Sequence, residues 1–120
     1  MNYVHLRGRL TADPDLKEVT TKSGEVIHVT RFSLAVNEFQ RPTQFIDCVA
    51  WRRLAETIIN HLKKGSEIIL TGKLTMSTEQ QSDNTWKKYA EVVAARVEFV
   101  GRKPEEEGIL VAEDEAVVVS

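Results

Sequence analysis

The stretch FIDCVAWRRLAE, residues 45–56, changes its hydrophobic period in the middle. Up to Trp51 it is rich in β-branched and aromatic residues and it follows the turn-like QRPTQ, which is typical of a strand. After Trp51 the apolar residues recur at helical spacing as far as Leu62, and the sequence KKG at 63–65 suits the end of a helix. The stretch therefore predicts a strand that leads directly into one short helix.

Alternation along this strand divides its side chains between two faces. Phe45 and Trp51 share one face with Asp47 and Val49. The other face is small and apolar and consists of Ile46, Cys48 and Ala50. Cys48 is the only cysteine of the chain, which excludes an internal disulfide and a cysteine-rich metal site. We interpret it as a small buried hydrophobe rather than a reactive thiol.

The composition is that of one globular domain: 120 residues, of which 42% are hydrophobic and 28% charged. No apolar run approaches the ~20 residues of a membrane span, and the opening MNYVHLRGRL lacks the layout of a signal peptide. We therefore expect a cytoplasmic protein.

Charge is distributed unevenly along the chain. Residues 1–103 contain all 16 lysines and arginines against 12 acids, a net charge of +4, whereas residues 104–120 contain six acids and no base. A basic body with an acidic tail suits a body that binds a polyanion and a tail that competes for the same surface or recruits partners. A solvated terminal charge run explains the tail equally well.

The order of elements predicts the fold. Alternating patterns indicate strands over residues 2–10, 26–37, 45–51, 67–76 and 86–100, with residues 16–21 as an extended continuation of the first and residues 77–84 as a polar hairpin tip. Five strands with one α-helix between strands 3 and 4 make an all-β fold of the OB type, a small barrel that binds ligands on one face and its loops. An α+β roll has the same element order and is the alternative. We expect the domain to span 1–103 and an acidic C-terminal tail, free or docked, to span 104–120.

No group of residues suggests an enzyme, a metal site or a cofactor. His5, His28 and His61 lack metal-ligand spacing, although His5 and His28 could meet across paired strands. Asp13 and Asp15 flank Pro14 and indicate a turn rather than an acid and a base. The chain also lacks a nucleophile-elbow motif and a glycine-rich phosphate loop.

Aromatic and basic residues make a better case for binding single-stranded nucleic acid, which needs rings for base stacking and cations for phosphates. The candidate platforms are Phe45 and Trp51, with Phe39, Trp86 and Tyr89 as further ones. The candidate phosphate contacts are Arg31, Arg41, Arg52, Arg53, Lys73, Lys87 and Lys88. For Phe45 and Trp51 the residues alone leave stacking and core packing equally open, whereas Phe32 and Phe99 are expected in the core.

Several blocks of sequence resemble the bacterial-type single-stranded DNA-binding proteins over residues 2–101. NYVHLRGRLTADPDL resembles the family's Asn-x-Val-x-Leu-x-Gly-x-Leu-x-x-Asp-Pro segment, and RFSLAVN, FIDCVAWRRLAE, KKGSEIILTGKL and YAEVVAARVEFV resemble its later strands in the right order. The resemblance implies an OB fold that assembles as a homotetramer through the first strand and binds single-stranded DNA without sequence preference. It implies a role in DNA replication, recombination and repair at the nucleoid, and places Phe45 and Trp51 at two base-stacking positions, with Phe39 near a third.

Four features depart from the family pattern. The connection at residues 38–44 is short, LTMSTE at 74–79 lacks the usual arginines and aromatic, and Asp47 places a negative charge between Phe45 and Trp51. Trp86 is our hypothesis for a residue that compensates in the hairpin. The ending AEDEAVVVS lacks a terminal Pro-Phe tip, which argues against recruitment of replication and repair proteins through such a tip. The reduced charge of the hairpin and Asp47 favour a second hypothesis, a protein-interaction OB module such as a primosome component similar to primosomal replication protein N, or a tail-docked regulatory subunit.

Overall fold

The computed structural model describes residues 1–100, 108–111 and 117–119. Its elements follow the chain in the order β1 (Val4–Leu10), β2 (Asp15–Thr20), β3 (Val26–Val36), β4 (Gln44–Trp51), α1 (Arg52–His61), β5 (Glu67–Gln80), β6 (Trp86–Phe99), β7 (Gly108–Val111) and β8 (Val117–Val119). The helix comes directly after β4, as the change of period after Trp51 predicts.

Five of these strands close into a barrel. β1 pairs with β3 and β5, β4 pairs with β3 and β6, and β5 pairs with β6, so that each strand of the ring has two neighbours. All of these pairs are antiparallel except β4 with β6. The all-β fold with an OB-type barrel of five strands, and with its helix between β4 and β5, is confirmed.

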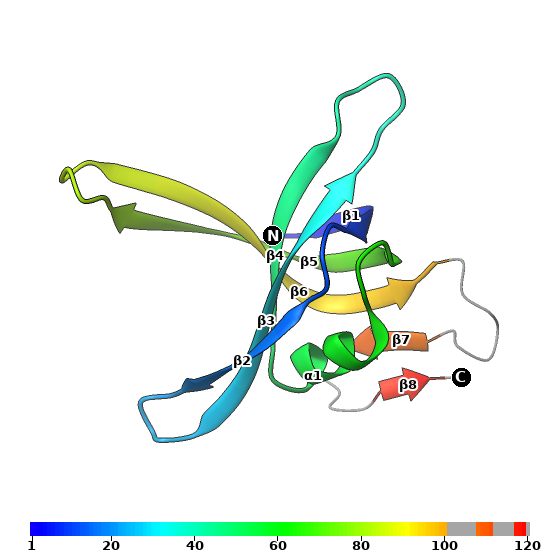
Figure 1. Cartoon of the computed structure of the whole chain (residues 1–120), viewed down its shortest axis with the longest axis horizontal. Helices are drawn as coiled ribbons and strands as arrows, with labels where there is room; N and C mark the ends of the chain where they lie inside the picture. Colours follow the sequence, from blue (N-terminus) through cyan, green and yellow to red (C-terminus); the bar gives the residue numbers. More distant parts are fainter. Residues whose placement is uncertain (101–107, 112–116, 120) are drawn as a thin grey trace.

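Three arms extend away from the barrel (Figure 1). They are the β2–β3 hairpin, the connection between β3 and β4, and the β5–β6 hairpin, which is drawn in yellow-green. The predicted hairpin tip at 77–84 is wrong in length, because β5 continues to Gln80 and the residues from Ser77 onward still pair with β6. The polar composition of these residues is typical of a loop. A two-stranded ribbon that is exposed on both faces, however, does not need alternating apolar residues to form strands.

The strands outside the ring are additions at its edges. β2 is a separate strand paired with β3 rather than a continuation of β1. β7 pairs with β6, and β8 pairs with β7. Both of these lie within the predicted acidic tail, but its six acids, Glu105, Glu106, Glu107, Glu113, Asp114 and Glu115, lie outside the described residues.

The core fills the barrel and lies against the helix. Inward-facing residues of β3, β5 and β6, such as Leu34, Leu70 and Val97, are fully buried, and Ile58 of α1 covers them from the helix. Phe32 also belongs to this cluster, as predicted. Burial of these side chains is what stabilises the barrel that positions the outward-facing residues.

Two glycines allow strands to approach closely. A Cβ on Gly72 would lie 2.1 Å from the carbonyl oxygen of Val93, and a Cβ on Gly8 would lie 2.6 Å from that of Ala35. The register between β5 and β6 shifts between Thr71 and Gly72, which marks a bulge at this point. Gly72 therefore sets the spacing of β5 and β6 where the long arm begins, and Gly8 sets the spacing of β1 and β3 at the other end of the barrel.

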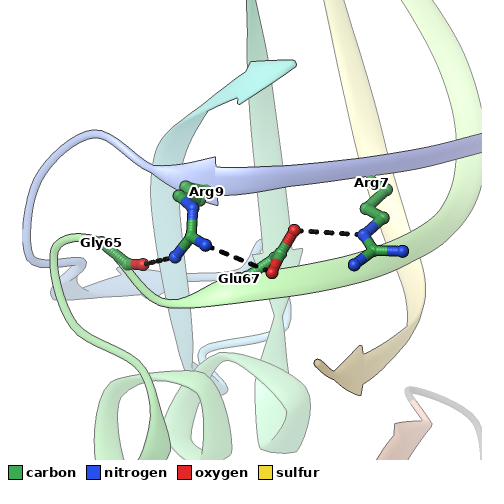
Figure 2. A network of polar contacts seen from close by, with 4 residues as sticks. All are labelled: Arg7, Arg9, Gly65 and Glu67. Atoms are coloured by element: carbon green, nitrogen blue, oxygen red, sulfur yellow. Dashed lines mark hydrogen bonds and ion pairs between the residues drawn. The ribbon is translucent and has the colours of Figure 1, made fainter. Parts of the chain in front are cut away.

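The outer face of β1 is tied to the start of β5 by a small polar network (Figure 2). The Glu67 carboxylate accepts from Arg7 Nε at 3.1 Å and from Arg9 at 3.4 Å, and Arg9 also donates to the Gly65 carbonyl at 3.0 Å. Gly65 has a φ of 88° and lies in the turn that leads into β5. This network lies across the β1–β5 pairing at the end of the barrel opposite the long arm.

Candidate nucleic-acid interface

The outer face of β4 carries the two predicted stacking residues. Phe45 is 67% exposed near the start of the strand, and Trp51 is half-buried at its last position. Asp47 is exposed between them, whereas Val49 is 1% exposed. At about 3.3 Å per residue the two rings are anchored ~20 Å apart. They can therefore hold two separate points of one strand but not adjacent bases.

Phe45 borders a hollow of about 260 Å³ at one end of the barrel. Val4 and Leu6 of β1, Ile46 of β4 and Leu74 of β5 line its apolar part. Phe45 is thus an exposed ring beside apolar side chains, which suits stacking on a base.

Strand register shows which other residues share the outer face. Val49 of β4 lies level with Val93 of β6, so the outward residues of β6 next to Asp47 and Phe45 are Glu91 and Tyr89. Arg31 of β3 lies opposite Val49. Directly opposite residues of an antiparallel pair share a face, so Lys73, opposite Val93, also lies on the outer face. Lys87 lies there too, because it is two positions before Tyr89 on the same strand.

Three of the arginines predicted to contact phosphates form ion pairs with carboxylates. Arg31 Nε lies 3.1 Å from Glu91 Oε2, Arg52 lies 3.0 Å from Glu25, and Arg41 lies 3.8 Å from Glu38. All of these arginine side chains are more than half exposed, so the ion pairs are weak and open to exchange. Only the Arg41 pair, at spacing i,i+3, could have been expected from the sequence.

Arg52 sits at the junction of β4 and α1 in an uncommon backbone conformation. Its φ is 60°, in the left-handed region, and the preceding Trp51 makes no side-chain cap to the helix. Such a φ is costly for a residue other than glycine and concentrates at functional positions. The turn directs Arg52 toward Glu25 and places its charge one residue from Trp51, while Arg53 lies in the first turn of the helix.

The β5–β6 arm divides its predicted residues between two faces. Lys87 and Tyr89 are on the outer face, where the Lys87 ammonium lies 5.1 Å from the centre of the Tyr89 ring. Trp86 lies opposite Gln80 and Lys88 opposite Thr78, on the reverse face of the ribbon. The structure therefore does not bring Trp86 and Lys88 together with Phe45, although Trp86 is 67% exposed.

Phe39 and Arg41 occupy the arm between β3 and β4. Phe39 is 89% exposed, and Gln40 beside it has a φ of 58°. This arm emerges next to Phe45 at the start of β4, so its residues can reach a ligand that lies on the outer face (Figure 1).

Cys48 is buried under this face and chemically quiet. Burial raises the pKa of its thiol to about 12, and the carboxylates of Asp47 and Glu91 add to the rise. A thiol with so high a pKa is a poor nucleophile at neutral pH. This agrees with the interpretation of Cys48 as a packing residue.

The histidines do not form a site. His5 lies opposite Thr71 and bonds its hydroxyl at 2.9 Å, whereas His28 lies opposite Glu18 and within 3.2 Å of Glu56. The two histidines therefore do not meet across paired strands, which the sequence had left possible. Within the described ranges, no cluster of side chains could hold a metal ion. The one helix of that part of the chain, at ten residues, is too short to cross a membrane.

Glu91 on the outer face, and Glu25 in the turn between β2 and β3, are ion-pair partners that the sequence did not reveal. Glu91 alternates with Tyr89 and so could be placed on the same side of β6, but its position beside Arg31 depends on the parallel register of β4 and β6. No local pattern encodes that register, because the helix and β5 lie between these strands.

Comparison with known proteins gives a consistent result. The model of the "Single-strand binding protein family" matches residues 1–100. A "Single-stranded DNA-binding protein" of Caldanaerobacter subterraneus subsp. tengcongensis is 40% identical over 121 residues, which cover 89% of this chain and 78% of that protein. Proteins of Oceanobacillus iheyensis ("Single-stranded DNA-binding protein") and Listeria innocua ("Single-stranded DNA-binding protein 2") are 38% and 40% identical, with 90% of this chain and 68% and 69% of their own lengths aligned.

Proposed function

This chain belongs to the single-strand binding protein family, and from that premise we propose that it binds single-stranded DNA by base stacking and phosphate contacts and without sequence specificity. Its role is to protect single strands during replication, recombination and repair, in the cytoplasm at the nucleoid. The activity is binding rather than catalysis. The observation that carries the proposal is the pair of rings on β4, Phe45 exposed and Trp51 half-exposed, on a face that also carries cations.

Each residue has a distinct part in the proposed complex. Phe45 and Trp51 stack on bases at two points of the strand, and Phe39 adds a third platform from its arm. The phosphate contacts along this path are Arg31, Arg41, Arg52, Lys73 and Lys87. Trp86 and Lys88, on the reverse of the β5–β6 arm, contact DNA that wraps around that arm.

The proposed assembly is a homotetramer, a dimer of dimers formed through β1. From Val4 to Gly8, β1 pairs with β5, and its pairing with β3 is confined to Arg9 and Leu10. The described residues thus leave one edge of β1 open over most of its length, and an open edge is a template for a second strand. Light scattering of the full chain measures the mass, and a monomer would contradict this assembly.

Tryptophan fluorescence tests the binding directly. The chain has two tryptophans, so a Trp86→Phe variant leaves Trp51 as the only indole. Titration of this variant with oligo-dT should quench Trp51, and the affinity should fall steeply between roughly 50 and 200 mM salt, because phosphate contacts release counterions. Absence of quenching and of gel retardation at low salt would refute the proposal.

A protein-interaction module is the second candidate, favoured by the carboxylates of Asp47 and Glu91 on the outer face. These charges repel phosphates and attract a basic partner. The salt titration separates the two candidates. The affinity of a DNA-binding protein for oligo-dT should rise steeply as salt is lowered, whereas that of a protein-interaction module should change little.

A further inference from the structure

The Arg31–Glu91 ion pair crosses over β4. Arg31 comes from β3 and Glu91 from β6, and these strands are the two neighbours of β4 in the barrel. Arg31 lies opposite Val49, and Glu91 lies level with Asp47 by the parallel register. The pair therefore spans the outer face of β4 at the midpoint between the two stacking rings.

Both partners are accessible at this point. The Arg31 side chain is 59% exposed and that of Glu91 28%, with 3.1 Å between Nε and Oε2. Together with Asp47 they line a hollow of about 280 Å³ on the same face. A strand that runs from Phe45 toward Trp51 must pass over this hollow and meets one guanidinium with two carboxylates.

We propose that Glu91 is an affinity-limiting residue: its carboxylate occupies Arg31 in the free protein, and single-stranded DNA must displace it to place a phosphate there. This inference rests on the proposed function. It adds that the affinity of the chain for DNA is lower than it would be if Arg31 were unpaired, and that the Glu91 side chain causes this difference.

The exchange has two measurable consequences. An exposed ion pair contributes little free energy, so the need to break it before DNA binds should lower the affinity by about 1.5- to 5-fold. Removal of the Glu91 carboxylate should recover this factor. A free Arg31 also makes a full phosphate contact, so the slope of log K against log salt should become steeper by up to about 0.7 for each protomer that contacts the strand.

Glu91→Gln in the full-length protein is the test, with oligo-dT as the ligand. Glu98→Gln is the matched control, because Glu98 lies on the same strand and pairs with Arg96 at 3.1 Å but does not line the hollow between the stacking rings. Arg31→Ala, alone and combined with Glu91→Gln, shows whether the effect depends on Arg31. Circular dichroism and light scattering establish that each variant keeps the fold and the mass of the original.

The expected result is tighter binding and a steeper salt slope for Glu91→Gln, no comparable gain for Glu98→Gln, and no gain from Glu91→Gln once Arg31 is alanine. Equal gains in the two glutamine variants would assign the effect to net charge and overturn the proposal. A gain that persists without Arg31, or no gain at all in a protein that binds DNA, would overturn it too. Failure of the unsubstituted protein to bind oligo-dT would instead refute the proposed function.

Discussion

Replacement of Phe45 by alanine should weaken DNA binding and cost less stability than replacement of a core phenylalanine. Stacking of one base on an aromatic side chain is worth about 1–3 kcal/mol, which corresponds to about a 5- to 160-fold loss of affinity. The effect on folding follows from exposure. Phe45 is 67% exposed, so about a third of a side chain that covers ~200 Å² is buried, or about 1.7 kcal/mol at ~25 cal/mol/Å². By comparison, Phe32, which is 7% exposed, should cost about 3–5 kcal/mol on replacement by alanine.

Two further substitutions separate the π-face from the apolar volume. Phe45→Leu keeps most of the contact with the hollow but removes the ring, so it should retain stability and still lose affinity. Phe45→Tyr keeps the ring and should bind like the original. The assay is quenching of Trp51 in the Trp86→Phe background by an oligo-dT of about ten nucleotides, within the 4–16 that one OB fold contacts. Urea unfolding gives the stability. If Phe45→Leu binds as well as Phe45, the ring does not stack on a base and the reasoning is refuted.

Three other predictions follow from positions in the barrel. Because the proposed DNA path wraps around the β5–β6 arm, Lys87→Gln and Lys88→Gln should both weaken binding in a salt-dependent way. A loss in gel retardation for Lys87→Gln alone would show that DNA keeps to the outer face of the arm. Gly72→Ala should lower the free energy of unfolding by about 1–3 kcal/mol, because the alanine Cβ would lie 2.1 Å from the Val93 carbonyl oxygen. A change below ~0.5 kcal/mol in urea unfolding would show that the backbone at the bulge shifts without cost. Above pH 9.0 the thiol of Cys48 ionises in the unfolded chain, but in the folded chain it stays protonated up to about pH 12. The free energy of unfolding, compared with that of Cys48→Ala, should therefore fall by up to ~1.4 kcal/mol per pH unit in this range. Parallel pH profiles of the two proteins would contradict this.

Alternation along β4 divided its residues between two faces and predicted the start of the helix, but it left open which face turns outward; the family resemblance assigned Phe45 and Trp51 to the ligand side. In the structure Phe45 is exposed, Cys48 and Ala50 are buried, and the helix begins at Arg52. The same pattern could not show that Val49 is buried on the outward side, because its covering depends on residues from neighbouring strands. Local pattern thus predicts a face, and only the assembled sheet determines how much of that face is open.

The β5–β6 arm shows the limit of reasoning from single strands. The sequence suggested Trp86, Lys87 and Lys88 as one group of candidate contacts, and each is exposed. Register against β5 places Lys87 on one face and the other two on the reverse. The sequence also left β2 as a continuation and ended β5 early, because exposed strands with polar side chains lack the apolar repeat by which strands are recognised.

Among the described strands, β4 and β6 form the one parallel pair, and this has a consequence for how the chain acquires its structure. β2 with β3, β3 with β4, and β5 with β6 are hairpins of neighbouring segments, which can form as soon as both strands exist. β4 can meet β6 only through Cys48 with Val92 and Val49 with Val93, after the helix and β5 have been synthesised. Pairing across such a sequence separation is slow, since the entropy of loop closure is lost before contacts are gained. On the ribosome the β4 edge therefore waits unpaired until β6 emerges, and in this interval the nascent chain is most open to pairing with the wrong strand.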